Sequence, residues 1–309
     1  MINQFRLTTF GESHGVAVGG VIEGCPSGLQ IDQQRIQHDL ARRATGSTAS
    51  ASQRKEADVV EFLSGLLDGV TLGTPVAFMV RNVDARPEDY EPFKDVFRPS
   101  HADYTYQQKY GIRDWRGGGR ASARTMLPYV VAGSIAKQLL ERHGIKVVAE
   151  VQSIGGETEN AKIEALLARC REAGDTVGGI VHGCIFGLPA GLGEPLDNKF
   201  QACLAKAMFT IPAVKGFEYG DGFAMASMKG SEANDNMISH EDGKMEFLSN
   251  HSGGIQGGIT NGEPVTFNVA FKPIPTLGKG NRHDVCALPR AVVMVEAMAA
   301  LTTVKLLDC

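Results

Sequence analysis

Residues 97–124 read FRPSHADYTYQQKYGIRDWRGGGRASAR, a segment that joins many basic side chains to a glycine hinge. Three consecutive glycines, Gly117 to Gly119, lie in its middle, and His101 lies near its start. Its charged residues are six basic and two acidic ones: Arg98, Lys109, Arg113, Arg116, Arg120 and Arg124, with Asp103 and Asp114. The whole chain has a net charge of -4, so an anion-binding site must come from such local clustering.

The composition is that of a globular protein with a substantial core. The chain has 309 residues, 43% of them hydrophobic, and no repeat or linker divides it, so we expect a single domain over residues 1–309. Its six cysteines are scattered without a CxxC pair, which is typical of reduced thiols in the cytoplasm. The N-terminus lacks the apolar core of a signal peptide, and no apolar run is long enough to span a membrane. The sequence therefore predicts a cytoplasmic protein without a membrane partner.

Strands and helices alternate irregularly along the chain. Segments rich in Val, Ile and Phe predict strands at Arg6–Thr9, Ala17–Glu23, Pro75–Arg81, Lys146–Ile154, Thr176–Leu188, Gly216–Tyr219 and Val265–Lys272. Apolar periodicity predicts helices after a cap at Asp32 up to Arg43, and at Ser122–His143, Asn160–Ala173, Phe200–Phe209 and Arg290–Leu307. Pro128 predicts a bend or a later start in the second of these helices. The mixture lacks a strict βαβ order, which favours an α+β fold.

Several familiar catalytic and binding motifs are absent from the sequence. No GxGxxG follows a strand and no GxxxxGK[ST] occurs, so neither a Rossmann dinucleotide site nor a P-loop is indicated. The chain also lacks HExxH, zinc-ligand spacing of Cys and His, and a GxSxG nucleophile elbow. We therefore expect no metal site.

Four polar, glycine-rich patches remain. The first is Thr8–Gly15 (TTFGESHG), the second is the opening segment, the third is Ser249–Gly262 and the fourth is Phe271–Asp284. Such segments make poor core and are expected as loops. If they converge, they bring together His14, His101, Arg120, Arg124, Lys272, Arg282 and Asp284. That set is a cationic pocket with two proton-transfer groups, suited to a phosphorylated or carboxylated ligand.

Each of these residue types also has a plainer interpretation. Lone histidines are usually hydrogen-bonding surface residues, and this is our expectation for His38, His143, His182 and His240. Arg98, Arg113 and Arg116 are as well explained by solvation, or by ion pairs with Asp103 and Asp114, as by ligand binding. Interleaved tyrosines and arginines also bind single-stranded RNA by stacking, but the acidic chain makes this the weaker reading, and we expect no nucleic-acid partner.

The four patches together closely resemble the signatures of the chorismate synthase family. FGESHG, RPSHADYTYQQKYGIRDWRGGGRASAR, NHSGGIQGG and RHD occur in the family's order, and the resemblance extends from Phe5 to about Leu307. It implies a β-α-β sandwich, in which helices cover sheets, and a homotetramer.

The resemblance also implies the reaction. Members of the family are carbon-oxygen lyases acting on phosphates, which convert 5-enolpyruvylshikimate 3-phosphate into chorismate by 1,4-anti elimination, a step of the shikimate pathway to the aromatic amino acids. They need reduced FMN although no net redox change occurs. NADPH is implied only as an indirect source of reduced flavin.

Residue roles follow from the same resemblance. His14 matches the histidine that protonates the leaving phosphate, His101 the one that protonates the reduced flavin, and Asp284 the aspartate that assists proton removal at N5 of the flavin. The implied substrate-binding residues are Ser13, Arg43 and Arg124. The implied flavin-binding residues are Arg120, Ala121, Ser122, Ala213, Gly257, Lys272, Pro273, Ile274, Pro275, Thr276 and Arg282.

The chain departs from the family pattern at a few positions. Ala49 stands where the family usually has an arginine, Thr125 and Tyr129 replace usual charged residues, and only Gly278–Asn281 separate KPIPTL from RHD. Losing one charged hydrogen-bond partner costs about 1.5–3 kcal/mol, or about 10- to 150-fold in affinity. The alternatives are a flavin-binding homologue that has lost turnover and, with less support, an NADPH-dependent flavin reductase.

Overall fold

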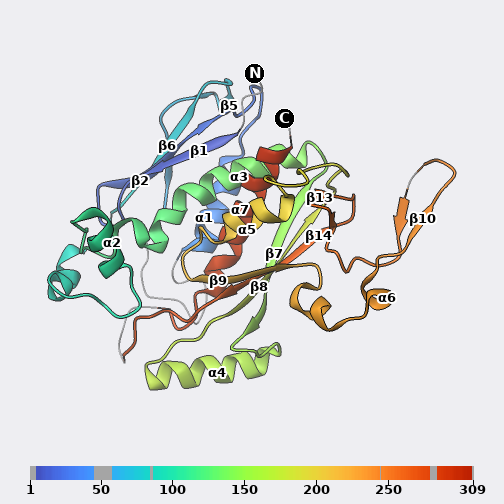
Figure 1. Cartoon of the computed structure of the whole chain (residues 1–309). Helices are drawn as coiled ribbons and strands as arrows, with labels where there is room; N and C mark the ends of the chain where they lie inside the picture. The colour runs from blue at the N-terminus through green and yellow to red at the C-terminus, as the bar shows by residue number, and fades with distance from the viewer. Residues whose placement is uncertain (1–4, 45–57, 84–85, 244, 279–283, 308–309) are drawn as a thin grey trace.

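Two four-stranded sheets enclose a layer of helices (Figure 1). The computed structural model describes residues 5–44, 58–83, 86–243, 245–278 and 284–307. The first sheet has the order β1-β2-β6-β3 and the second the order β7-β8-β14-β9, and every pairing in both is antiparallel. This arrangement confirms the predicted α+β sandwich.

The first sheet consists of β1 (Arg6–Phe10), β2 (Ala17–Glu23), β6 (Val76–Arg81) and β3 (Val60–Phe62). The second consists of β7 (Lys146–Ile154), β8 (Gly179–Phe186), β14 (Val265–Phe271) and β9 (Val214–Tyr219). Side chains of β14 alternate between fully and partly buried, because one face of the sheet covers the helices. Short hairpins join β4 (Leu66–Leu67) to β5 (Val70–Thr71), β10 (Met237–Ser239) to β11 (Met245–Phe247), and β12 (Ile255–Gln256) to β13 (Ile259–Thr260).

The helical layer contains α1 (Gln33–Arg43), α3 (Leu127–Glu141), α5 (Phe200–Met208) and α7 (Leu288–Leu306). Helix α7 is buried on nearly all sides, as its almost wholly apolar sequence predicts. Asp32 caps α1 as predicted, because its Oδ1 accepts from the backbone N–H groups of Gln34 (2.9 Å) and Arg35 (3.1 Å). Within the described ranges, no helix combines the length and apolar character needed to cross a bilayer.

Two predicted elements differ from the structure. The helix expected from Ser122 starts at Leu127, which is the later start that Pro128 predicted, and a 3-10 turn over Ala123–Met126 precedes it. The second patch was expected as a loop throughout, but it contains helix α2 (Asp103–Tyr110), which ends at Gly111 in the left-handed conformation. Its side chains show almost no helical amphipathicity, so periodicity could not reveal it.

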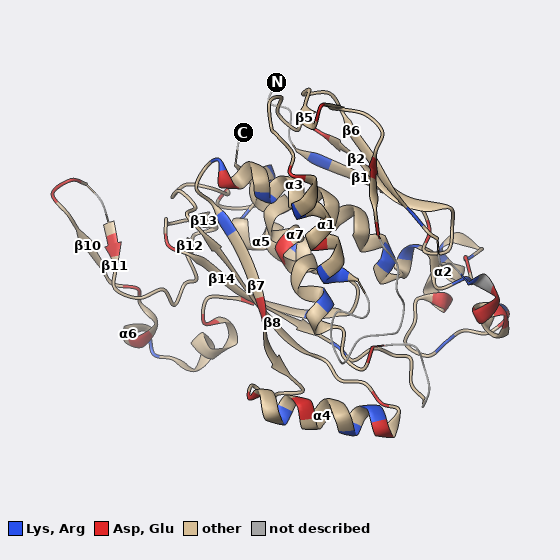
Figure 2. Cartoon of the chain, turned by 180° about the vertical axis from the view of Figure 1, so that it is seen from behind, with Lys and Arg blue, Asp and Glu red and all other residues tan. Residues whose placement is uncertain are grey.

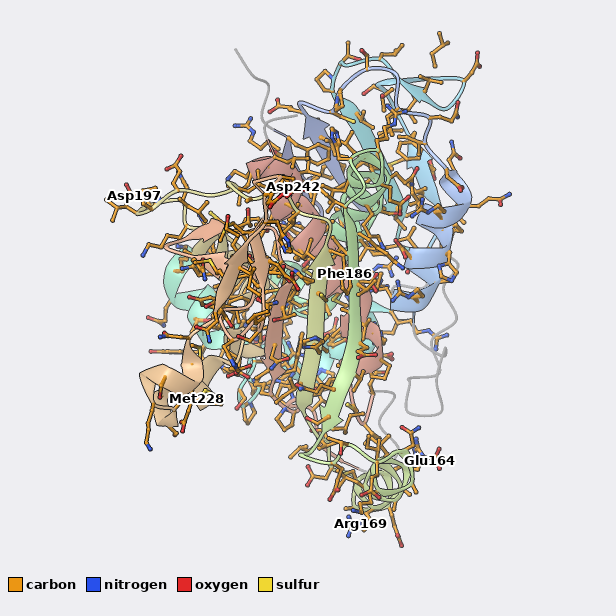
Figure 3. All side chains as sticks on the ribbon, turned by 90° about the vertical axis from the view of Figure 1, so that its right-hand side faces the viewer. Glu164, Arg169, Phe186, Asp197, Met228 and Asp242 are labelled. Atoms are coloured by element: carbon orange, nitrogen blue, oxygen red, sulfur yellow. The ribbon has the colours of Figure 1, made fainter. Side chains whose placement is uncertain are left out.

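The remaining helices lie at the surface. Helix α4 (Asn160–Ala173) has no buried residue, and acidic and basic side chains follow one another along it (Figure 2). Figure 3 shows Glu164 and Arg169 on this helix, which projects at one end of the molecule. Helix α6 (Gly230–Ala233) is a single turn before the β10–β11 hairpin.

Four charged residues join three helices of the central layer. Lys137 on α3 contacts Asp39 (2.7 Å) on α1 and Glu296 (3.1 Å) on α7. Arg42 on α1 contacts the same two carboxylates at 3.2 and 2.7 Å. The cluster is electrically balanced, which is the condition under which buried charges are tolerated. It fixes the end of α1 immediately before Arg43.

Helices α3 and α7 approach each other at Gly133. A Cβ atom at this position would lie 2.4 Å from the Cβ and 2.5 Å from the Cα of Ala297. We expect Gly133→Ala to lower the free energy of unfolding by about 1–3 kcal/mol, because α7 must move to admit the methyl group. Gly230→Ala in α6 is the matched control, since nothing lies within 4 Å of its added Cβ. Urea unfolding of both variants tests this, and equal stability of the two would contradict the close packing.

Candidate active site

The first and second patches meet at the end of the first sheet. Arg120 donates to the carbonyl of Gly11 (2.9 Å) and to the hydroxyl of Thr9 (2.7 Å). Asn82, which follows β6, donates its amide N–H groups to the carbonyls of Glu12 (3.0 Å) and Gly15 (2.8 Å). These bonds hold the turn that carries Ser13 and His14 against the glycine hinge.

His14 is buried beside the glycine hinge. Its Nδ1 lies 3.0 Å from the Oγ of Ser13, and its ring packs edge-on against Tyr90 with 4.9 Å between ring centroids. A Cβ atom on Gly117 would lie 2.0 Å from Cε1 of His14, so only glycine fits there. Gly117 also has a φ of +62°, which favours glycine independently.

His101 lies against the fourth patch. Its Nδ1 is 2.9 Å from the carbonyl oxygen of Pro99 and its Nε2 is 3.2 Å from the hydroxyl of Thr276. A carbonyl only accepts, so Nδ1 carries the proton in the neutral ring and Nε2 is the basic nitrogen. Burial lowers the pKa of His101, and the bond to Pro99 partly opposes this.

The backbone directly before His101 is tied to the fourth patch. Lys272 donates from Nζ to the carbonyl of Ser100 (3.3 Å) and from its backbone N–H to the carbonyl of Ala213 (2.9 Å). Ser100 and Ala213 have φ values of +59° and +70°, which are strained for residues other than glycine. The hydroxyl of Thr176 donates to the carbonyl of Ile274 (2.7 Å) and so fixes the middle of this patch.

Two buried arginines share one aspartate, and Asn82 links this group to the turn that carries His14. Nη2 of Arg43 lies 2.8 Å from Oδ2 of Asp58, and Nη1 of Arg124 lies 3.1 Å from Oδ1 of the same carboxylate. Arg124 also donates to the side-chain oxygen of Asn82, which holds the His14 turn. Burial lowers the pKa of Arg43 to about 10, so it stays cationic at neutral pH.

Asp284 joins this group through Arg290. Nη1 of Arg290 donates to Oδ2 of Asp284, and Nε donates to the carbonyl of Arg43 at 2.8 Å. Arg290, which lies in α7, thus links the predicted Asp284 to the backbone of Arg43. Arg282 and Ala49, the other two predicted positions of interest here, lie outside the described residues.

Other basic residues of the second patch form ion pairs within it. Arg98 binds Asp103 at 2.8 and 2.9 Å, and Arg116 binds Asp114 at 2.8 Å. Arg113 lies 3.9 Å from Asp103 and donates to three backbone carbonyls. The plainer interpretation of these three arginines is therefore confirmed, and they stabilise the segment around His101.

The third patch does not join this cluster within the chain. Gly257 lies in the turn of the β12–β13 hairpin, where the carbonyl of Gly258 accepts from the backbone of Phe200 (2.8 Å). This hairpin precedes β14, and Figure 1 shows it on the opposite side of the molecule from α2. His251 of the same patch binds Asp221 at 2.5 Å.

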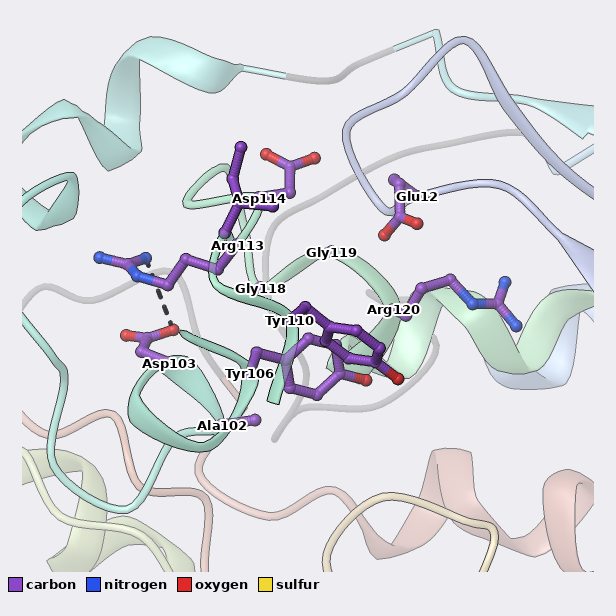
Figure 4. Close-up of a pocket in the computed structure, with 11 residues that line it drawn as sticks. Glu12, Ala102, Asp103, Tyr106, Tyr110, Arg113, Asp114, Gly118, Gly119 and Arg120 are labelled. Carbon is purple, nitrogen blue, oxygen red and sulfur yellow. Dashed lines mark ion pairs between the residues drawn. The ribbon is translucent and has the colours of Figure 1, made fainter. Parts of the chain in front are cut away.

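A pocket of about 450 Å³ opens between α2 and the glycine hinge (Figure 4). Its polar walls include Glu12, Tyr106, Tyr110 and Arg120. Burial raises the pKa of Glu12, and the charge of Arg120 opposes this shift. Sequence reasoning missed Glu12 and Asp58 as members of the site. The GESHG motif could have revealed Glu12, whereas nothing in the sequence around Asp58 marked it as a site residue.

Histidines, arginines and carboxylates from three distant patches thus adjoin one end of the sandwich, and they define an α+β enzyme with a cationic site. The family model for chorismate synthase matches residues 5–307. The chain therefore belongs to the chorismate synthase family, and it is a lyase.

Curated relatives and a solved structure agree with the family model. A chorismate synthase of Porphyromonas gingivalis is 50% identical over 339 residues, covering 96% of this chain and 92% of the relative. One of Christiangramia forsetii is 50% identical and covers 96% and 94%. A crystal structure of chorismate synthase superimposes with a TM-score of 0.82 at 30% identity, covering 99% of this chain and 92% of that one. The first alignment exceeds the 309 residues of this chain, so the relative has segments without a counterpart here.

Proposed function

We propose that the chain catalyses the FMN-dependent 1,4-anti elimination of phosphate from 5-enolpyruvylshikimate 3-phosphate, which yields chorismate. The observation that carries this proposal is the buried pair Arg43 and Arg124, which shares the single carboxylate of Asp58. Two guanidinium groups held side by side on one carboxylate suit a substrate that bears two carboxylates and a phosphate. A single domain, a cytoplasmic location and a homotetramer belong to the same proposal.

Three side chains of the chain each take part in a different proton transfer. His14, held by Ser13 and Gly117, donates a proton to the oxygen of the leaving phosphate. His101 exchanges a proton at Nε2, since the carbonyl of Pro99 occupies Nδ1. Asp284, fixed by Arg290, would assist proton removal at N5 of a bound flavin.

The residues around His101 suit a phosphorylated cofactor. Lys272 and Thr276 offer an ammonium and a hydroxyl beside His101, and the backbone of Ala213 adjoins them. With Arg120, Ala121, Ser122, Pro273, Ile274, Pro275 and Arg282 they are the residues proposed to hold FMN. Reduced FMN, when bound, supplies an electron that is returned at the end of the reaction. NADPH serves only to reduce the flavin elsewhere.

An anaerobic assay tests the activity. The protein is mixed with dithionite-reduced FMN and 5-enolpyruvylshikimate 3-phosphate, and chorismate absorbance and free phosphate are followed together. Equimolar appearance of both products is expected. Binding of FMN and substrate without either product would favour a homologue that has lost turnover. Oxidation of NADPH by FMN and the protein alone, well above the uncatalysed rate, would favour a flavin reductase.

The glycine hinge provides a more specific prediction. Gly117→Ala places a methyl group on the ring of His14, and we expect turnover to fall about 10²-fold, because a displacement of about 1 Å has effects of this size. Gly118→Ala is the matched control, since its φ of +86° imposes similar backbone strain but its Cβ meets only Nη2 of Arg98, at 3.6 Å. Equal turnover of the two variants would contradict the role of Gly117.

A further inference from the structure

We propose that Asp58 is an internal counter-ion that determines the anion selectivity of the Arg43–Arg124 pair and keeps inorganic phosphate weakly bound. The inference rests on the proposed function in one respect, namely that these two arginines bind the substrate. Asp58 does not contact the reacting atoms. Its charge determines how strongly the two arginines bind an anion.

The geometry places one carboxylate between two cations. Each oxygen of Asp58 faces a different guanidinium group, at 2.8 Å for Arg43 and 3.1 Å for Arg124. The exposed fractions of the three side chains are 2%, 5% and 9% for Asp58, Arg43 and Arg124. Water therefore screens these charges little, and each one strongly affects the others.

All three groups are fixed by further bonds. Gln37 donates from Nε2 to the backbone carbonyl of Asp58 at 2.9 Å. The guanidinium of Arg124 donates to the side chain of Asn82 and to the carbonyl of Arg81 at 3.2 Å. The carbonyl of Arg43 accepts from Arg290. The two arginines therefore cannot separate freely when the charge between them changes.

The trio also retains donor capacity for a ligand. Nε of Arg43 is buried and has no hydrogen-bond partner among the residues that the structure describes. A buried donor of this kind is costly to leave unsatisfied, so an anion that accepts from it would gain a favourable hydrogen bond. The trio has a net charge of one positive unit, and it would have two without Asp58.

This charge balance matters because phosphate is a product of the proposed reaction. Without Asp58 the two buried arginines would hold a free phosphate dianion more tightly and so retain the product. Asp58 repels any anion that approaches the pair. A substrate with three anionic groups compensates through its additional contacts, whereas phosphate alone cannot.

The test is the dissociation constant of inorganic phosphate, measured by calorimetry on the full chain without flavin or turnover. We expect Asp58→Asn to bind phosphate at least tenfold more tightly than the wild type. Glu296→Gln is the matched control, because Glu296 is also buried and also bridges two cations, Arg42 and Lys137, but lies in the helical cluster. Its phosphate affinity should stay within twofold of the wild type.

A second comparison covers the case in which Asp58→Asn does not fold. Arg43→Gln removes one cation, and Arg43→Gln combined with Asp58→Asn restores the net charge of the wild-type trio. The double variant should bind phosphate at least tenfold more tightly than Arg43→Gln alone. Unchanged or weaker phosphate binding on removal of Asp58, in either background, would overturn the inference. Absence of chorismate formation by the wild type would instead refute the proposed function and leave this comparison intact.

Discussion

Replacing His101 by alanine is expected to lower kcat by about 10²–10⁴ in the anaerobic assay, as is typical for loss of a positioned proton-transfer group. The hydrogen bond to Pro99 fixes the ring so that Nε2 exchanges the proton, and alanine removes that nitrogen. Because burial lowers the pKa of His101, its protonated form becomes abundant only below its ordinary range near 6.5. The acidic form therefore declines as pH rises, and a rate limited by it should decline as well.

Two variants separate catalysis by His101 from an effect on folding. His143→Ala alters an exposed histidine beyond the end of α3 and should leave kcat unchanged. Thr276→Val removes the hydroxyl that lies 3.2 Å from Nε2, and we expect an intermediate loss that Thr276→Ser largely restores. A His101→Ala variant that folds and turns over like the wild type would remove His101 from the mechanism.

The fold was largely predictable because its determinants are local or repetitive. Strands β2 and β7 and helix α4 have the predicted bounds, since glycine or a change of periodicity marks their ends. Helix α2 was missed because it is short and has no apolar face, and is instead braced by ion pairs such as Arg98–Asp103. A helix of eight residues is marginal on its own, so its stability depends on such polar contacts, which hydrophobic periodicity does not report.

The site was predictable only in part, for a related reason. Glycine-rich patches marked His14, His101 and Asp284, because turns that position functional groups need unusual backbone angles. Asp58 lies outside every patch, and its partner Arg124 is distant in the sequence. The number of basic residues in the second patch overstated the positive charge that it offers to a ligand. Arg98 and Arg116 are each paired with an aspartate of the same patch.

Replacing His14 by alanine is expected to reduce kcat as strongly as loss of His101, by about 10²–10⁴, but through a different proton. His14 is buried between Ser13, Tyr90 and Gly117, and alanine removes the donor for the leaving phosphate. The measurement is kcat with release of chorismate and phosphate followed together.

The two histidines are distinguished by how substrate binding responds. His14→Ala leaves Arg43, Arg124 and Asp58 in place, so the dissociation constant of 5-enolpyruvylshikimate 3-phosphate should change less than tenfold while kcat falls. FMN binding should be unchanged in this variant, whereas it should weaken in Thr276→Val, whose hydroxyl lies in the fourth patch. Ser13→Ala, which removes the hydroxyl 3.0 Å from Nδ1, should reproduce part of the loss because the ring is then held less firmly. Turnover that survives in His14→Ala would remove His14 from the mechanism. Substrate binding lost together with turnover would show instead that His14 holds the substrate.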